Sequence, residues 1–416
     1  MHIGLVLATA FISIATGFLA GIYPAYYMTS FPPALVLKGS FGLSPKGRQL
    51  RNALIGVQYV ASFGLIIGAT FMYLQNYYMQ NTPLGYDKDE IIITNMNNNI
   101  RKSRDAFASQ VKSFSGIEEV TYAEMLLSSQ DQYMGWGRKY RDKDIQFQCL
   151  PVEPSFLKVM NVKISEGRDF REEDKAKRYG TFVFNERART EYGLEIGSLI
   201  DSMEIVGFMP DVKFASFRTE VTPMAFFVWG TNNWGNQPNY AYIKVKAGSD
   251  LRGAMQHVKT TLQSFDPEYP FNVRFFDEVL NGLYEKERSL SSLITLFSLI
   301  AIFISVVGVF GLVVFDSEYR KKEIGIRKVL GSTTEEIIVM FNKTYIRILC
   351  VCFVLGAPIA GYVVHRWLEN FAYKTPMYWW VYLIAFAIIA VITILTVTFQ
   401  NWRAANENPV HSIKNE

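Results

Sequence analysis

The chain has 416 residues, half of them hydrophobic, and its 42 basic side chains nearly balance 38 acidic ones. A formal charge of +4 is too small for a general binder of nucleic acid or another polyanion. Uncharged stretches of about 20 residues recur, and each can cross a hydrocarbon core about 30 Å thick as a helix. These features predict a multi-pass α-helical membrane protein.

Five stretches have the length and composition of transmembrane helices. In chain order they are residues 3–23, 53–75, 289–315, 344–364 and 378–399. The fourth contains Arg347 near one end, where its stem can reach the interface, and Pro358, which predicts a kink. The fifth opens with Trp379 and Trp380, which are typical of a membrane surface.

Basic residues beside these stretches predict the orientation of the chain. Four of them and no acidic residue lie between the first two spans: Lys38, Lys46, Arg48 and Arg51. The connection between the third and fourth spans carries another basic cluster, so both connections should face the cytoplasm. The segment 79–288 and the short connection 366–377 then face outward.

The spans also divide the chain into domains. We assign residues 1–27 to a membrane helix that ends a preceding module, residues 28–52 to a cytoplasmic linker, and residues 53–78 to the next membrane helix. A short pattern shared by "PPALVLKG" and "NPVHSIKN" supports this division. Chance similarity of two interfacial tails is the alternative.

The outward segment 79–288 has the pattern of a folded domain rather than a spacer. Strand-like stretches such as "GTFVFN", "MEIVGFM" and "YAYIKVKA" occur among helix-like stretches and turn signals. The expected result is a large mixed α+β extracytoplasmic domain of one or two lobes. Its single cysteine, Cys149, cannot form a disulfide within it.

Motifs of enzyme chemistry are absent from the sequence. It contains no G-x-x-x-x-G-K-[ST] phosphate loop, no G-x-S-x-G nucleophile elbow, and no C-x-x-C or H-E-x-x-H metal pattern. We therefore expect no catalytic residues, no cofactor and no metal site in the chain itself. An enzyme anchored to the membrane is the alternative, and activity of the purified outward domain would favour it.

The stretch "RKKEIGIRKVLG", residues 320–331, is the strongest local signal. Five apolar residues around it recur at intervals of seven and four, as on one stripe of a helix: Tyr319, Ile326, Leu330, Ile337 and Phe341. Gly331 should end this helix, and Ser332 with Glu335 should begin the next through a capping box. The pattern predicts an amphipathic helix at 318–331 that lies on the cytoplasmic surface before the chain re-enters the membrane.

Several stretches resemble one protein family. "EYRKKEIGIRKVLGSTTEEI" is similar to the cytoplasmic signature of the MacB/FtsX-like permeases of ABC transporters. "SEGRDFREED", "VFNERA" and "MEIVGFMPDVKFASF" resemble parts of the MacB-like periplasmic core domain, and "WRAANENPVHSIKNE" resembles the C-terminal ending of the family. The resemblance identifies 79–288 as that core domain and 289–416 as an FtsX-like permease domain with three membrane helices. "GIYPAYYMTSFPPALVLKGS" resembles the junction in tandem eight-span members, so we expect the second half of such a protein.

The resemblance implies a permease subunit in the inner membrane of a bacterium. Its ATPase-coupling region corresponds here to Glu323, Gly325, Ile326, Arg327, Lys328 and Gly331. The implied partners are two copies of a cytoplasmic ABC ATPase, a second permease half or a second copy of this chain, membrane lipids and a periplasmic adaptor, with no nucleic acid.

ATP-driven motion would then reach the periplasmic domain and export or extract a peptide, drug or lipoprotein. An FtsX-like signal transmitter that activates a cell-wall hydrolase is the alternative function. For the basic stretch itself, the simpler alternative is that its charges only mark the cytoplasmic side.

Overall fold

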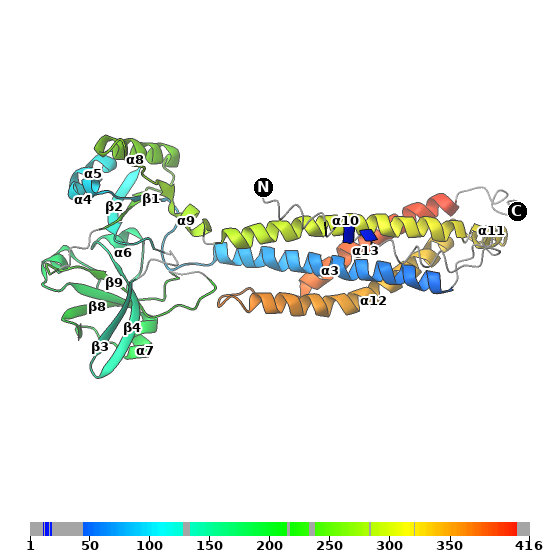
Figure 1. Cartoon of the computed structure of the whole chain (residues 1–416), viewed down its shortest axis with the longest axis horizontal. Coiled ribbons are helices and arrows are strands. Elements are labelled where there is room, and N and C mark those ends of the chain that lie inside the picture. Colours follow the sequence, from blue (N-terminus) through cyan, green and yellow to red (C-terminus); the bar gives the residue numbers. More distant parts are fainter. Residues whose placement is uncertain are drawn as a thin grey trace.

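A computed structural model describes residues 11, 13–15, 17–18, 45–127, 134–213, 217–232, 238–282, 284–319 and 321–405. The molecule is elongated, with a bundle of long helices at one end and an α/β domain at the other (Figure 1). Four helices in these ranges can cross a membrane: Ala53–Asn81, Glu287–Gly311, Thr334–Leu368 and Trp379–Arg403. They correspond to four of the five predicted spans, and the span predicted at 3–23 lies mostly outside the described residues.

The bundle consists of α3 (Pro45–Asn81), α10 (Glu285–Tyr319), α12 (Thr334–Leu368) and α13 (Trp379–Ala405). Their buried residues recur every three or four positions, as in Tyr59, Phe63 and Ile67 of α3, so each helix turns one face inward. A Cβ at Gly356 would lie only 3.3 Å from Cα of Val60, so the glycine lets α12 approach α3 closely. The helix α12 runs through Pro358 without a break.

Hydrogen bonds between side chains connect the helices inside the bundle. The hydroxyls of Ser62 in α3 and Ser305 in α10 lie 2.8 Å apart. Those of Tyr59 and Thr393 lie 3.0 Å apart and join α3 to α13. Because lipid offers no partner to a polar group, such pairs favour one register of the helices over others.

The α/β domain has two lobes, each built on a sheet. In the first lobe, four antiparallel strands follow the order β11 (Arg274–Phe275), β1 (Ile91–Asn95), β10 (Tyr240–Val245) and β2 (Ile117–Ala123). The helices α4 (Asn98–Lys102), α5 (Arg104–Lys112) and α8 (Leu251–Phe265) accompany this sheet. Phe107 of α5 and Val258 of α8 pack against Ile243 of β10 in a fully buried core.

The second lobe contains a seven-stranded sheet. Its order is β3 (Met134–Tyr140), β4 (Lys143–Pro151), β9 (Met224–Val228), β6 (Thr181–Asn185), β8 (Met203–Met209) and β5 (Glu166–Gly167), and β7 (Leu199–Ile200) pairs with β8. The short helices are α6 (Phe156–Val159), η1 (Glu172–Ala176) and α7 (Glu186–Tyr192), while α9 (Phe276–Gly282) leads to α10. The strand-like stretches of the sequence are β6, β8 and β10.

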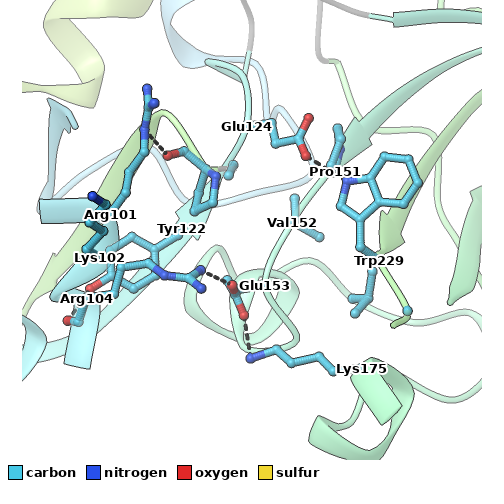
Figure 2. Close-up of a pocket in the computed structure, with 14 residues that line it drawn as sticks. Arg101, Lys102, Arg104, Tyr122, Glu124, Pro151, Val152, Glu153, Lys175 and Trp229 are labelled. Carbon is cyan, nitrogen blue, oxygen red and sulfur yellow. Dashed lines mark hydrogen bonds and ion pairs between the residues drawn. The ribbon is translucent and has the colours of Figure 1, made fainter. Parts of the chain in front are cut away.

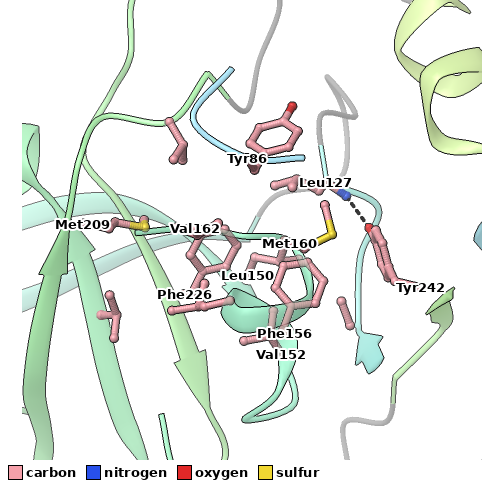
Figure 3. Packing of buried hydrophobic residues seen from close by; sticks show 14 of the residues in the cluster. Tyr86, Leu127, Leu150, Val152, Phe156, Met160, Val162, Met209, Phe226 and Tyr242 are labelled. Atoms are coloured by element: carbon pink, nitrogen blue, oxygen red, sulfur yellow. Dashed lines mark hydrogen bonds between the residues drawn. The ribbon is translucent and has the colours of Figure 1, made fainter. Parts of the chain in front are cut away.

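A shared core holds the lobes together. Figure 3 shows Tyr242 of β10 beside Phe156 of α6, with ring centroids 5.1 Å apart, and Phe226 of β9 lies 5.7 Å from Phe156. The Tyr242 hydroxyl accepts a hydrogen bond of 2.7 Å from the backbone N–H of Leu127. Residues of both sheets therefore contribute to one buried cluster.

Candidate functional site

A tight turn leads into α12 at the end of the bundle far from the α/β domain (Figure 1). The helix α11 (Lys321–Val329) precedes it, and Gly331 has a φ of +95°, which a residue with a Cβ rarely adopts. The N–H of Gly331 donates to the carbonyl of Lys328 at 3.0 Å, and that of Ser332 to Arg327 at 2.9 Å. This pair of bonds is a Schellman motif, so the prediction that Gly331 ends the helix is correct.

The start of α12 differs from the prediction by one residue. The N-cap is Thr333, whose hydroxyl accepts from the N–H of Glu336, and the Glu336 carboxylate accepts from the N–H of Thr333. The predicted pair of Ser332 and Glu335 is therefore wrong. Ser332 already completes the preceding cap through its N–H, and the sequence "STTEE" offers the same box one position later.

The predicted apolar stripe does not form one buried face. Ile337 and Phe341 are buried in α12, but Ile326 is 48% exposed and Leu330 is 80% exposed. The left-handed turn at Gly331 changes the chain direction, so residues before and after it cannot share a helix face. Ile324 takes the buried position in α11 instead.

This turn presents apolar and basic side chains together. Ile326, Val329 and Leu330 are exposed, and Arg327 is exposed beside them, with its guanidinium 2.7 Å from Sδ of Met340 in α12. Lys328 is half-buried. Glu323 and Gly325 lie within α11, where the structure describes the backbone and not the side chain of Glu323. The predicted coupling residues are thus within one helix and its C-terminal cap.

At the opposite end of the bundle, near the α/β domain, a buried polar contact joins two parts of the bundle. Gln75 of α3 is fully buried, and its Nε2 donates to the carbonyl of Tyr373 at 3.0 Å. Its Oε1 accepts from the N–H of Thr375 at 2.8 Å. One amide therefore fixes the connection between α12 and α13 to α3.

The same connection also contacts the α/β domain. The N–H of Tyr373 donates to the carbonyl of Phe217 at 3.1 Å, and the Tyr373 hydroxyl accepts from the N–H of Val221 at 3.2 Å. The ammonium of Lys213 lies 5.0 Å from the ring centroid of Phe217 and 4.9 Å from that of Tyr373. Partial burial lowers the pKa of Lys213.

An ion pair provides the third link. Arg218 of the α/β domain donates to the carboxylate of Glu287, in the first turn of α10. We call Gln75, Phe217, Arg218, Glu287 and Tyr373 the junction. The junction connects α3, α10 and the α12–α13 connection to one segment of the α/β domain. Movement of these helices must therefore either move the α/β domain or break contacts in the junction.

The junction could not be predicted from local sequence patterns, because its residues are scattered from position 75 to position 373. Only the aromatic content of "NFAYKTPMYWW" signals that the connection is more than a spacer. Within the described residues, no group of three or more His, Cys, Asp or Glu side chains could hold a metal ion.

The bundle and the domain that it carries define a multi-pass membrane protein with one large domain on one side of the membrane. Residues 54–261 match the MacB-like periplasmic core domain, and residues 295–409 match the FtsX-like permease C-terminal domain. The chain therefore belongs to the MacB/FtsX-like family of ABC transporter permeases. It is a protein of the bacterial inner membrane, and its α/β domain is periplasmic.

Curated relatives share part of this chain. The macrolide export ATP-binding/permease protein MacB of Chromobacterium violaceum is 23% identical over 230 residues, which are 53% of this chain and 35% of that protein. MacB of Escherichia coli strain K12 is 23% identical over 233 residues, with the same coverage. The chain thus matches about a third of the length of these relatives.

Solved structures of related periplasmic regions are also similar. The periplasmic region of MacB from Actinobacillus actinomycetemcomitans aligns with a TM-score of 0.35 and 13% identity, over 48% of this chain and 95% of that one. The extracellular domain of the noncanonic ABC-type transporter YknZ aligns with a TM-score of 0.32 and 11% identity, over 44% and 99%.

Proposed function

We propose that this permease transmits the ATP-driven motion of a separate ATPase to its periplasmic domain, and that this motion exports or extracts a substrate. The observation that carries the proposal is the continuity of the bundle. The helix α12 begins just after the turn at Gly331 and runs without a break to the periplasmic side, where the connection after it enters the junction. The helix α10 begins at Glu285 on the periplasmic side, carries Glu287 of the junction in its first turn, and runs to Tyr319, shortly before α11.

The turn at Gly331 has the chemistry of a docking element. Ile326, Val329 and Leu330 expose apolar surface beside the basic side chain of Arg327. An interface that combines an apolar centre with charged positions at its rim gains affinity from the first and orientation from the second. We assign the ATPase contact to Glu323, Gly325, Ile326, Arg327, Lys328 and Gly331, with two ATPase copies serving two permease halves.

The junction is the corresponding output element. Rigid helices carry displacement well, because packed interiors have low compressibility. The bonds from Gln75 to the Tyr373 segment and from Arg218 to Glu287 oblige the periplasmic domain to follow the helices. The curated relatives named above export macrolides, and a peptide, drug or lipoprotein is the cargo class that we propose here.

Site-specific crosslinking tests the ATPase contact. A photoreactive amino acid at Leu330, which is 80% exposed, should crosslink to the ATPase when both are expressed in one membrane. The matched control is Leu199, which is 60% exposed in the periplasmic domain and should give no such product. Equal crosslinking at both positions, or none at Leu330 in functional protein, would contradict the proposal.

The output is tested in the same cells. Cargo leaving the periplasm or the inner membrane in an ATP-dependent manner supports transport. Activation of a cell-wall hydrolase with no cargo moved would instead assign the chain to the signal-transmitting members of the family. Neither outcome contradicts the ATPase contact. This experiment therefore tests what the motion does in the periplasm, and the crosslinking tests whether the ATPase binds.

A further inference from the structure

A cavity of about 410 Å³ lies where the two lobes of the periplasmic domain meet. Figure 2 shows Arg101, Lys102 and Arg104 on one side of it, and Trp229 with Glu124 on the other. The basic residues belong to α4 and α5 of the first lobe, and Trp229 follows β9 of the second. Its volume falls in the range of small-molecule sites.

The basic side carries charge that the protein does not neutralise. Arg101 donates to Asn239 Oδ1 at 2.5 Å, to Asn98 Oδ1 at 3.1 Å and to the backbone carbonyls of Pro238 and Met96. All four acceptors are neutral, so none of them cancels its charge. Lys102 is exposed and has no hydrogen bond or ion pair among the residues that the structure describes. Two cations are therefore available to an anionic group of a ligand.

The floor of the cavity is internally satisfied. Glu153 pairs with Arg104 through Oε1 at 2.6 Å and with Lys175 through Oε2 at 2.5 Å. Because both carboxylate oxygens are occupied, this network holds the two lobes in position rather than offering a free acceptor. Val152 adds an apolar surface beside it.

The opposite side combines a carboxyl group and an indole. Glu124 is only 7% exposed, and its Oε1 accepts from Nε1 of Trp229 at 2.6 Å. Its other carboxyl oxygen has no hydrogen-bond partner within the described part of the chain. Burial raises the pKa of Glu124 to about 7, against the opposing effect of the Trp229 hydrogen bond. Because an indole N–H lies in the plane of its ring, this hydrogen bond places Glu124 at the edge of Trp229. The second carboxyl oxygen can accept from an ammonium group, and the indole face can add a cation–π contact.

We propose that this cavity binds a small zwitterionic molecule of peptide-like chemistry, with its carboxylate toward Arg101 and Lys102 and its ammonium group toward Glu124 and Trp229. The ligand would bridge the two lobes, so its binding would favour one arrangement of them. This role goes beyond force transmission, because binding requires neither the ATPase nor the turn at Gly331.

Calorimetric titration of the purified full chain in lipid nanodiscs tests the charge assignment. The probe is the dipeptide alanyl-phenylalanine, compared with its C-terminal amide, its N-acetyl derivative and inorganic phosphate. Loss of one charged contact should weaken binding by about tenfold or more, so the amide and the N-acetyl form should both bind less tightly than the zwitterion. Phosphate should bind weakly.

Variants of the two sides then identify the contacts. Lys102→Gln should lower the affinity for the zwitterion about tenfold and leave the already low affinity for the amide unchanged. Glu124→Gln should lower the affinity for the zwitterion and leave that for the N-acetyl form unchanged. Lys259→Gln, which alters an exposed lysine of α8 outside the cavity, is the matched control and should bind like the parent. Thermal unfolding confirms that each variant is folded.

The pH dependence of dipeptide affinity distinguishes direct binding by Glu124 from a purely structural role of this residue. The ammonium group favours the ionised form of Glu124, so affinity for the dipeptide should rise with pH through about 7 in the parent and not in Glu124→Gln. Absence of saturable dipeptide binding would overturn the proposal. Phosphate binding as tightly as the dipeptide, or both variants binding like the parent, would overturn it equally.

Discussion

Arg218 of the periplasmic domain binds Glu287 of α10 through two nitrogen atoms, with Nε and Nη2 at 2.9 and 2.6 Å from Oε1. The Glu287 side chain is 8% exposed, whereas that of Arg218 is 45% exposed. Oε2 of Glu287 is buried with no hydrogen-bond partner among the described residues. A buried carboxylate at the first turn of a membrane helix thus depends on an arginine of the domain that the helix carries.

Replacing Arg218 by Gln should destabilise the junction. The change leaves the Glu287 charge buried and unpaired, and because Arg218 is half exposed we expect a cost of about 1 to 3 kcal/mol, below that of a fully buried pair. Thermal unfolding of the full chain should show the loss, and cargo output should fall while the ATPase still co-purifies.

A double variant separates charge from transmission. Adding Glu287→Gln to Arg218→Gln removes the buried charge, so stability should recover in part, but the link between domain and helix is still missing. Output should therefore remain low. If Arg218→Gln unfolds like the parent and retains full output, the ion pair has no role in the junction.

Tyr373 allows packing and hydrogen bonding to be distinguished. Tyr373→Phe removes only the hydroxyl that accepts from the N–H of Val221, and a hydrogen bond of this kind contributes about 1 kcal/mol. Tyr373→Ala also removes the ring beside Phe217, whose centroid lies 5.9 Å away, so its loss of stability and output should be clearly larger. Equal effects of the two variants would show that the ring contributes nothing.

The periplasmic domain should fold without the bundle. The buried residues of its three hydrophobic cores all lie between 86 and 280. A small separate cluster of Met79, Phe217 and Phe371 lies at its boundary, beside the other contacts of the junction. Met79 and Arg288, the ends of the predicted domain, line the same cavity of about 400 Å³, so the two ends lie close together. A purified fragment 79–288 should be soluble and unfold in one cooperative transition, and a fragment without such a transition would show that the boundaries are wrong.

The stability of this domain should depend on pH through Glu124. The pKa of Glu124 in the folded domain, about 7, lies above the usual 4.5. Its protonation therefore contributes to the free energy of unfolding fully below about pH 4.5, and this contribution is lost as the pH rises through 7. The loss amounts to about 3 kcal/mol at most. Denaturant titrations at pH 5 and pH 8 should show a smaller decrease for Glu124→Gln than for the parent, and equal decreases would contradict the assignment.

Sequence patterns predicted those parts of the fold that depend on local periodicity. The long apolar runs became α3, α10, α12 and α13, and Gly331 ends α11 as its position suggested. The capping residue was misplaced, because Ser332 and Thr333 are equivalent by pattern and only the hydrogen bond from Ser332 to Arg327 decides between them.

Features that depend on distant residues could not be predicted in this way. Gln75 and Thr375 are 300 positions apart, and Glu124 and Trp229 are 105 apart. Neither pair follows from spacing along one helix or strand. The junction and the cavity between the lobes therefore emerge only when the tertiary fold brings their residues together.

We assign the turn at Gly331 to ATPase binding, and its charge and its geometry can be changed separately. In the double variant Arg327→Glu and Lys328→Glu, the charge beside exposed Ile326 and Leu330 is reversed, so the ATPase should dissociate while the bundle stays intact. In Gly331→Val, no charge changes, but a β-branched residue at a φ of +95° costs about 1 to 2 kcal/mol or more and redirects the chain into α12. The ATPase should still bind this variant, and output should fall. Co-purification of the ATPase and ATP-dependent output, measured at equal membrane abundance, distinguish the two defects. Parental behaviour of both variants would mean that the basic residues of α11 only mark the cytoplasmic side.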